Sequence, residues 1–343
     1  MRPGWDAKPN RRNQQKNEAH ILLDEPEPQP VDSSAIQTQL HKTSHNVHVP
    51  ELPDLVVYLE ALEARVLEQP LEQIRIGNPF VLRSVDPPLD RLHGCIVRGV
   101  RRVGKRLVLA FDDELFLVLH LMIAGRLRWR GGGQKPGVGP KMILASLQFA
   151  SGTLLFTEAG STKRASMHAV RGEQALMEMD RGGLEPLSAT REQFFEGLTR
   201  ENHTLKRALT DPRLFSGIGN AYSDEILHKA RLSPMQLTHK ISADASARLF
   251  DAAQATLLHW IAHLRRSAAG TFPEKVTAFH SDMAVHGRFG QPCPDCTAPV
   301  QRIVYAANEC NYCAICQTGG KLLADRALSR LLKSDWPKTL EEW

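Results

Sequence analysis

The stretch "DPRLFSGIGNAYSDEIL", Asp211 to Leu227, joins two segments that both have a helical pattern. Gly217 and Gly219 stand just before Asn220, which we expect to be the N-cap of the second helix. Glycines at such a turn allow close approach of the backbone, and the first amide groups of the next helix are unpaired and partly positive. The stretch therefore predicts either a phosphate-binding helix N-terminus or a tight turn whose glycines only satisfy the geometry.

The segments around this turn divide the chain into a strand-rich part and a helical part. Apolar residues at helical spacing predict four helices, within residues 188–198, 201–211, 220–230 and 242–264. Their expected N-caps are Thr190, Asn202, Asn220 and Ser242. Upstream, residues 74–157 contain short runs that predict strands: "EQIRIG", "CIVRGV", "KRLVLAF", "ELFLVLHL", "KMILASLQF" and "TLLFT". This pattern predicts a β-sandwich or barrel followed by a helical domain.

The beginning of the chain changes character abruptly at Pro50. Residues 1–49 contain a proline-rich acidic patch and show no helical or strand period, so we expect a disordered leader. From Pro50 onward the pattern becomes regular, and Leu55, Leu59 and Leu62 fall at helical spacing. The sequence therefore predicts that the folded part opens with a helix.

Five of the six cysteines lie between Cys293 and Cys316. Two C-x2-C pairs, Cys293/Cys296 and Cys313/Cys316, are separated by sixteen residues, a spacing typical of a tetrahedral zinc site made of four thiolates. Cys310 does not fit either pair and is expected to be a bystander. The segment between the pairs predicts a β-hairpin. Such a zinc hairpin is compatible with DNA, RNA or protein binding.

Composition narrows the class of protein. The 343 residues are 42% hydrophobic and 24% charged, and the net charge is +5. No apolar run reaches the roughly 20 residues that cross a bilayer, and the N-terminus lacks a secretory signal. We therefore expect a cytoplasmic protein without a membrane partner. A modest positive charge is compatible with a nucleic-acid partner.

Taken in order, several motifs resemble the formamidopyrimidine-DNA glycosylase / endonuclease VIII family, bacterial type with a zinc finger. They are "PELPD", "HLMIAGRLRW", "GGLEPL", "DPRLFSGIGNAYSDEIL" and "CAICQ". The resemblance implies an α+β, two-domain fold: an N-terminal β-sandwich with an opening helix, then a helix-two-turn-helix domain with a zinc β-hairpin finger. The expected divisions are 1–49 leader, 50–180 catalytic β domain, 181–280 helix-two-turn-helix domain, 281–320 zinc finger and 321–343 tail.

The resemblance also implies an activity. Family members remove oxidised bases from double-stranded DNA and cut the resulting abasic site, through a Schiff base on an N-terminal proline. Pro50 matches that proline, Glu51 the neighbouring acid that protonates the sugar or leaving group, and Lys105 the lysine that assists elimination. The expected protein is a bacterial, nucleoid-associated monomer with one structural Zn²⁺. The alternative is a non-catalytic zinc protein that binds damaged DNA.

Residues matching the family's DNA contacts complete the expected site. Asn220 and Lys206 match phosphate-contacting positions, and Lys163 and Arg164 stand in for loop arginines. The chain departs from the family pattern at three positions: Ile123 replaces a methionine, Ala165 stands where a phenylalanine wedge is usual, and Asn308 replaces the finger arginine. These departures concern lesion choice and the second elimination step.

Position 50 raises a question about the terminus. A proline inside a chain has an amide nitrogen, which cannot form an iminium, so Pro50 acts only if it becomes the first residue. Val49 precedes it, and a GTG codon there would serve as a bacterial start codon. We therefore expect translation to begin at codon 49. The alternatives are a genuine leader that is cleaved and a family member that binds DNA without catalysis.

Overall fold

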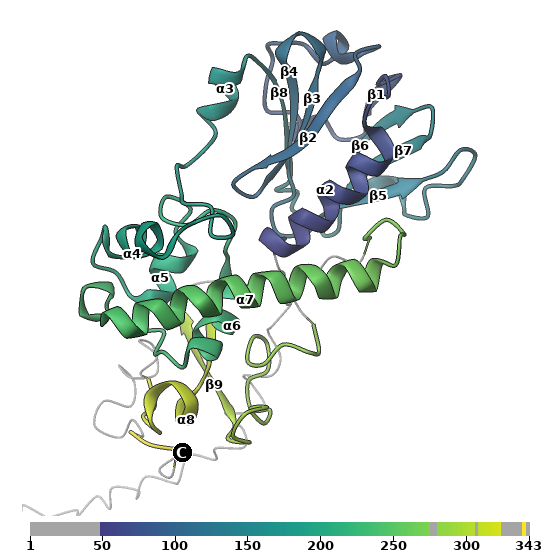
Figure 1. Cartoon of the computed structure of the whole chain (residues 1–343). Helices are drawn as coiled ribbons and strands as arrows, with labels where there is room; N and C mark the ends of the chain where they lie inside the picture. Colours follow the sequence, from purple (N-terminus) through teal and green to yellow (C-terminus); the bar gives the residue numbers. More distant parts are fainter. Residues whose placement is uncertain (1–48, 275–279, 306–307, 324–337, 341–343) are drawn as a thin grey trace, which may run out of the picture. The chain divides into compact units, whose positions relative to one another are not determined.

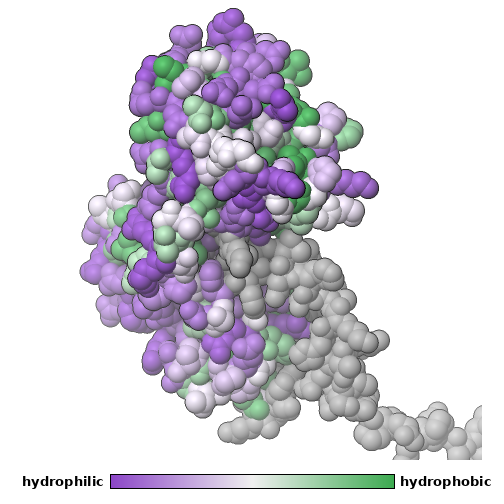
Figure 2. Space-filling view, turned by 90° about the vertical axis from the view of Figure 1, so that its right-hand side faces the viewer, coloured by the Kyte–Doolittle hydropathy of each residue, from purple (hydrophilic) through white to green (hydrophobic). Residues whose placement is uncertain are grey.

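The computed structural model describes residues 49–274, 280–305, 308–323 and 338–340 (Figure 1). The predicted disordered leader, residues 1–49, lies outside the described residues except for Val49. Within the described ranges, no helix has both the length and the hydrophobicity needed to cross a bilayer. The face seen in Figure 2 is largely hydrophilic, with small separate apolar patches.

The first folded part consists of two antiparallel sheets of four strands each. One sheet contains, in spatial order, β1 (Gln73–Ile76), β6 (Ile143–Phe149), β7 (Gly152–Glu158) and β5 (Gly125–Arg130). The other contains β2 (Val97–Val103), β3 (Arg106–Phe111), β4 (Leu115–His120) and β8 (Ser166–Arg171). The predicted sandwich is confirmed, although β5 and β8 were not among the predicted strands. Between strands lie the 3-10 turns η1 (Pro79–Val81), η2 (Leu89–Leu92), η3 (Asp112–Glu114) and η4 (Pro140–Met142).

One hydrophobic core fills the space between the two sheets and the opening helix, α2 (Leu52–Val66). Alternating strand residues such as Leu117 and Leu154 contribute from each sheet, and Tyr58 and Leu62 contribute from α2. A smaller cluster joins the other face of the second sheet to α3 (Glu173–Met177) through Leu176. The sandwich is therefore covered by helices at two places.

The second folded part is helical and has its own core. It contains α4 (Arg191–Thr199), α5 (Leu205–Thr210), α6 (Asn220–Ala230), η5 (Thr238–Lys240) and the long α7 (Ala243–Ala268), drawn in green in Figure 1. Leu52, the first residue of α2, is fully buried in this second core, and its amide donates to the Gly217 carbonyl at 2.9 Å. The opening helix thus belongs to both cores.

Helix starts test the predicted N-caps. Thr190 and Ser242 are confirmed, because their hydroxyls accept from backbone amides three residues ahead. The predictions of Asn202 and Asn220 were wrong: Thr204 caps α5 and Gly219 occupies the N-cap of α6. At α6 the reason is that a carboxylate distant in sequence satisfies the free amides, so no local side chain is needed.

The cysteine segment forms the predicted β-hairpin. Strands β9 (Val300–Tyr305) and β10 (Asn308–Cys313) pair antiparallel, and the short helix α8 (Ala314–Thr318) follows. Contacts join β10 to α6, since the Asn220 amide Nδ2 donates to the Glu309 carbonyl at 2.7 Å. The hairpin is therefore attached to the helical domain.

Candidate active site and metal centre

The carboxylate of Glu51 is the centre of a buried hydrogen-bond cluster at the start of α6. Its two oxygens accept from the backbone amides of Gly219 at 2.7 Å, Ala221 at 2.9 Å and Tyr222 at 3.2 Å. Glu51 is only 2% exposed. These amides are the donors that a helix leaves unpaired, at its positive end. A side chain from the first folded residues therefore serves as the cap of a helix that begins at residue 220.

Two glycines make this approach possible. A Cβ on Gly219 would lie 2.5 Å from the Glu51 carboxyl carbon and would also clash with the Lys105 ammonium. Gly217 has a φ of +81°, and a Cβ there would lie 2.9 Å from Leu52. The turn glycines predicted from sequence thus allow a close approach. The anion that the α6 N-terminus holds here is a side chain of the protein.

The Lys105 ammonium and the Glu51 carboxyl both lie beside Gly219, because a Cβ there would meet them at 2.4 and 2.5 Å. Lys105 is half-buried in the turn between β2 and β3. Burial of its ammonium lowers the pKa of Lys105, and the carboxylates of Glu51 and Asp54 oppose that effect. The structure therefore brings two of the three predicted catalytic side chains together.

Pro50 immediately precedes this cluster and is itself buried. The Glu51 amide donates to Asp54 Oδ2 at 2.8 Å, which fixes the peptide between Pro50 and the helix. Burial raises the pKa of Asp54 to about 7, and its second oxygen has no hydrogen-bond partner among the described residues. Asp54 was not among the predicted site residues. Its spacing of three from Glu51, as in a capping box, was the available signal.

Lys206 and Asn220 occupy different environments. Lys206 is 3% exposed, and its ammonium donates to Asp224 Oδ1 at 2.5 Å and to the Asn220 carbonyl at 2.6 Å. This placement favours a structural role for Lys206 over the predicted phosphate contact. Asn220 is half-buried, with its Nδ2 directed to the hairpin carbonyl of Glu309.

The loop after β7 is organised by the buried carboxylate of Glu158. This carboxylate accepts from the amides of Arg164 and Ala165, while Lys163 donates to the Glu158 carbonyl at 2.5 Å. Arg164 is exposed. Ala165, at 2% exposure, packs in the core of the sandwich. The expectation that Ala165 provides no bulky wedge into DNA agrees with this placement, since its side chain faces the interior.

The two remaining predicted DNA-binding positions lie in connecting segments. Ile123 is half-buried in the turn between β4 and β5, where its carbonyl accepts from Arg126 at 3.2 Å. Asn308 opens β10, and its backbone pairs with Tyr305. The Asn308 side chain falls outside what the structure describes.

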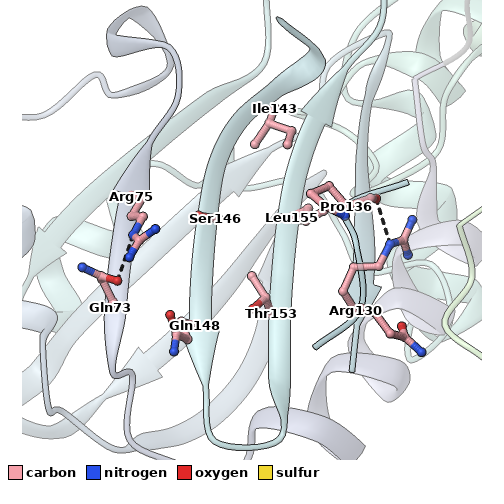
Figure 3. Close-up of a pocket in the computed structure, with 10 residues that line it drawn as sticks. Gln73, Arg75, Arg130, Pro136, Ile143, Ser146, Gln148, Thr153 and Leu155 are labelled. Carbon is pink, nitrogen blue, oxygen red and sulfur yellow. Dashed lines mark hydrogen bonds between the residues drawn. The ribbon is translucent and has the colours of Figure 1, made fainter. Parts of the chain in front are cut away.

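A pocket on the solvent face of the first sheet is separate from these residues (Figure 3). It has a volume of about 240 Å³. Its lining comes from Gln73, Arg75, Arg130, Gln134, Pro136, Ile143, Ser146, Gln148, Thr153 and Leu155. This set contains no acid, histidine, cysteine or lysine, and none of the predicted site residues.

Four sulfur atoms gather at the base of the hairpin. The Sγ atoms of Cys293, Cys296, Cys313 and Cys316 all lie within 4.8 Å of one another. The Cys293–Cys316 and Cys296–Cys313 separations are 4.0 and 3.3 Å, close to the edge of about 3.8 Å that four thiolates around one zinc require. Cys310 is buried outside this group, in the hairpin's own apolar cluster. The four cysteines therefore fit a tetrahedral metal ion.

Two buried acids on α6, Asp224 and Glu225, were missed by sequence reasoning. Asp224 Oδ2 contacts His286 Nδ1 at 2.8 Å and accepts from the Asn311 amide at 3.1 Å. Glu225 accepts from the amides of residues 284–286 at 2.8 to 2.9 Å. In the sequence both look like the polar side of an amphipathic helix. They instead connect α6 to the segment leading into the hairpin.

Comparison with known proteins gives the same picture as this geometry. The model of the formamidopyrimidine-DNA glycosylase N-terminal domain matches residues 49–161, and that of the formamidopyrimidine-DNA glycosylase H2TH domain matches residues 183–269. A formamidopyrimidine-DNA glycosylase of Dechloromonas aromatica is 30% identical over 285 residues, covering 78% of this chain and 100% of the relative.

Solved structures agree with these matches. The MutM (Fpg) protein from Thermus thermophilus is 30% identical, with a TM-score of 0.64 over 78% of this chain and 98% of that one. The LlFpg protein in complex with a THF-DNA and an inhibitor is 25% identical, with a TM-score of 0.69 over 78% and 100%.

The sandwich, the helical domain and the cysteine hairpin together define a two-domain protein of the helix-two-turn-helix class. The chain belongs to the formamidopyrimidine-DNA glycosylase family.

Proposed function

We propose that this chain is a base-excision-repair DNA glycosylase with abasic-site lyase activity, and that its nucleophile is the nitrogen of Pro50. The substrate is double-stranded DNA with an oxidised base or an abasic site, as in the solved complexes of the family. The observation that carries the proposal is the Glu51 carboxylate, held by three backbone amides beside Lys105 and directly after Pro50.

The proposed roles follow from this arrangement. The Pro50 nitrogen, as a free secondary amine, attacks C1′ of the damaged nucleotide, and the base leaves. The C1′–O4′ bond then breaks as the ring oxygen takes a proton, which leaves an iminium between the Pro50 nitrogen and C1′. This iminium draws electrons from the sugar, so that elimination breaks the strand. In this proposal Glu51 takes the proton that the attacking Pro50 nitrogen loses and passes it to the sugar ring oxygen, and Lys105 assists the elimination with an ammonium whose pKa is lowered by burial. DNA enters with its target nucleotide out of the stack.

The hairpin supplies the second element of the proposal. We infer that the metal bound by Cys293, Cys296, Cys313 and Cys316 is one Zn²⁺ with a structural role, since four thiolates leave no open coordination position. Contacts between β10 and the start of α6, such as Asn220 with Glu309, support a position of the hairpin beside the Glu51 cluster. We also propose a cytoplasmic location; the relatives named above are bacterial.

One observation favours a second candidate, a protein that binds damaged DNA without catalysis. In the full chain Val49 precedes Pro50, so that the Pro50 nitrogen is an amide. The first candidate requires a chain that begins at Pro50, made by translation from codon 49 or by cleavage.

Borohydride trapping on abasic-site DNA separates the two candidates. A form that begins at Pro50 should become covalently linked to the DNA, and the 343-residue form should not. N-terminal sequencing by mass spectrometry of protein from its native host should find Pro50 first. Equal trapping by both forms would instead point to Lys105 or another internal amine, and trapping by neither would support the binding protein.

A further inference from the structure

The last turn of α6 places a histidine against the cysteine cluster. His228 is 4% exposed, and its Nε2 lies 3.3 Å from the Sγ of Cys293, which is 1% exposed. The contact joins side chains that are 65 residues apart in sequence. It lies at the opposite end of α6 from the Glu51 cluster, and the role given to the four cysteines does not require it.

The chemistry of a metal-bound thiolate decides which atom carries the proton. A cysteine that binds a metal has lost its thiol proton, so that its sulfur can only accept a hydrogen bond. The ring nitrogen facing Cys293 must then be Nε2–H, and the imidazole donates. Four thiolates around one Zn²⁺ also carry a net charge of −2, which a buried site must stabilise with donors.

Other groups near the ring are consistent with a donor. Asp295 Oδ2 lies 4.0 Å from His228 Nε2, and Arg231 lies 3.9 Å from the same carboxylate. His228, Asp295 and Cys316 also lie close enough together for one metal ion. That set would make His228 a ligand, but four cysteines already complete a tetrahedron without it.

We propose that His228 is a positioning residue of the metal centre, whose Nε2–H donates to the Cys293 thiolate and fastens the end of α6 to the finger. The inference rests on the proposed metal site but not on the DNA chemistry. It predicts that removing the donor weakens metal binding and changes the electronic state of the thiolate, while the fold and the other three thiolates stay in place.

Two variants of similar shape isolate the hydrogen bond. His228→Gln keeps an N–H at a similar reach, whereas His228→Met fills the space without a donor. Zinc affinity should fall about 10- to 100-fold in His228→Met, the usual effect of losing an outer hydrogen bond to a ligand, and far less in His228→Gln. In Co²⁺-substituted protein the sulfur-to-metal charge-transfer band should move to lower energy in His228→Met only, because an unbonded thiolate gives up its electrons more easily. His259→Met, on the exposed side of α7, is the control.

A measurement on the unmodified protein covers the case in which His228→Met does not fold. NMR of the cadmium-loaded protein should show the His228 Hε2 proton coupled to the metal across the N–H···S bond. An unprotonated Nε2, or a Co²⁺ spectrum of three sulfurs and one nitrogen that changes in both variants, would overturn the inference. Equal zinc affinities in wild type, Gln and Met proteins would do the same. A wild-type protein that binds no zinc would overturn the metal site itself.

Discussion

The two ends of α6 each contact an anionic group, but the helix dipole acts on them in opposite directions. At the N-terminal end, the Glu51 carboxylate accepts three amides at the positive end of the helix. At the C-terminal end, the cysteine cluster lies near the negative end, where a bound thiolate group is disfavoured. The first anion accepts hydrogen bonds from the backbone amides, with the Lys105 ammonium nearby, whereas the second needs a side-chain donor such as His228. The comparison shows that the two ends of α6 stabilise negative charge differently: the N-terminal end through its backbone amides and the C-terminal end through a side chain.

Removing the negative charge of Glu51, at the N-terminal end of α6, should have the largest effect on activity. In Glu51→Gln the side chain presents an NH₂ group toward backbone amides that are themselves donors, so one anchor is lost together with the proton carrier. We expect base excision by the form beginning at Pro50 to fall about 10²- to 10⁴-fold, the usual weight of general acid–base catalysis. Single-turnover assays measure it. Cutting of a ready-made abasic site should fall less, and equal losses in both assays would contradict the assignment.

Gly219→Ala disturbs the same end without changing a charge. The added Cβ would meet the Glu51 carboxyl carbon at 2.5 Å, so the carboxylate must move. We expect excision to fall by about tenfold or more and unfolding free energy by about 1–3 kcal/mol, as for other overpacked sites. Gly132→Ala is a matched control, because a Cβ there meets nothing within 4 Å. If the two variants behave alike, close approach at Gly219 is not required.

Disrupting the cysteine cluster near the C-terminal end of α6 should weaken DNA binding but leave base excision and strand cleavage largely intact. Cys313→Ser removes one of the four thiolates, so we expect loss of stoichiometric zinc and a loosened hairpin. The affinity for duplex DNA should fall by roughly tenfold, or about 1.4 kcal/mol. Metal analysis and fluorescence anisotropy measure the two effects, with Cys95→Ser as the control because Cys95 lies outside the cluster. Full affinity in the zinc-free variant would count against a role of the finger in binding.

The smallest expected effect concerns Asp54, the buried acid beside Glu51. Its pKa is about 7 in the folded protein against 3.8 for the free group, so the folded state prefers the protonated form. This preference stabilises the fold fully below about pH 4 and is lost progressively as the pH rises from about 4 to just above 7. Between pH 6 and 8 the unfolding free energy should fall by about 1 kcal/mol in wild type relative to Asp54→Asn. Urea titrations at several pH values test this, and parallel pH profiles would disprove it.

Local patterns predicted the elements of this molecule well and its long-range contacts poorly. The cysteine spacing, the hairpin, the opening helix and the caps Thr190 and Ser242 depend on residues a few positions apart. The strand β5, "GRLRWR", was missed because alternating arginines weaken a short apolar pattern. The strand β8 was missed because it follows a polar loop.

The site itself depends on contacts that no local pattern contains. The Glu51 bonds to α6 span 168 to 171 positions. The same is true of Lys206, which the resemblance matched to a phosphate-contacting position but which is buried against Asp224, eighteen residues later. Ala165 likewise turned out to face the core. Resemblance to a family supplied the pairing of Glu51 with Lys105, and the structure supplied the reason for it.

The place of Leu52 has a consequence for how the chain is made. This residue is among the first of the folded part to leave the ribosome, yet it is fully buried in the core of the helical domain. That core can close only when α4 to α7 have been synthesised, more than a hundred residues later. During synthesis, Leu52 and the first turn of α2 must therefore stay exposed or make other contacts until the helical domain has been made. If the helical domain were produced alone, its core would lack the Leu52 side chain.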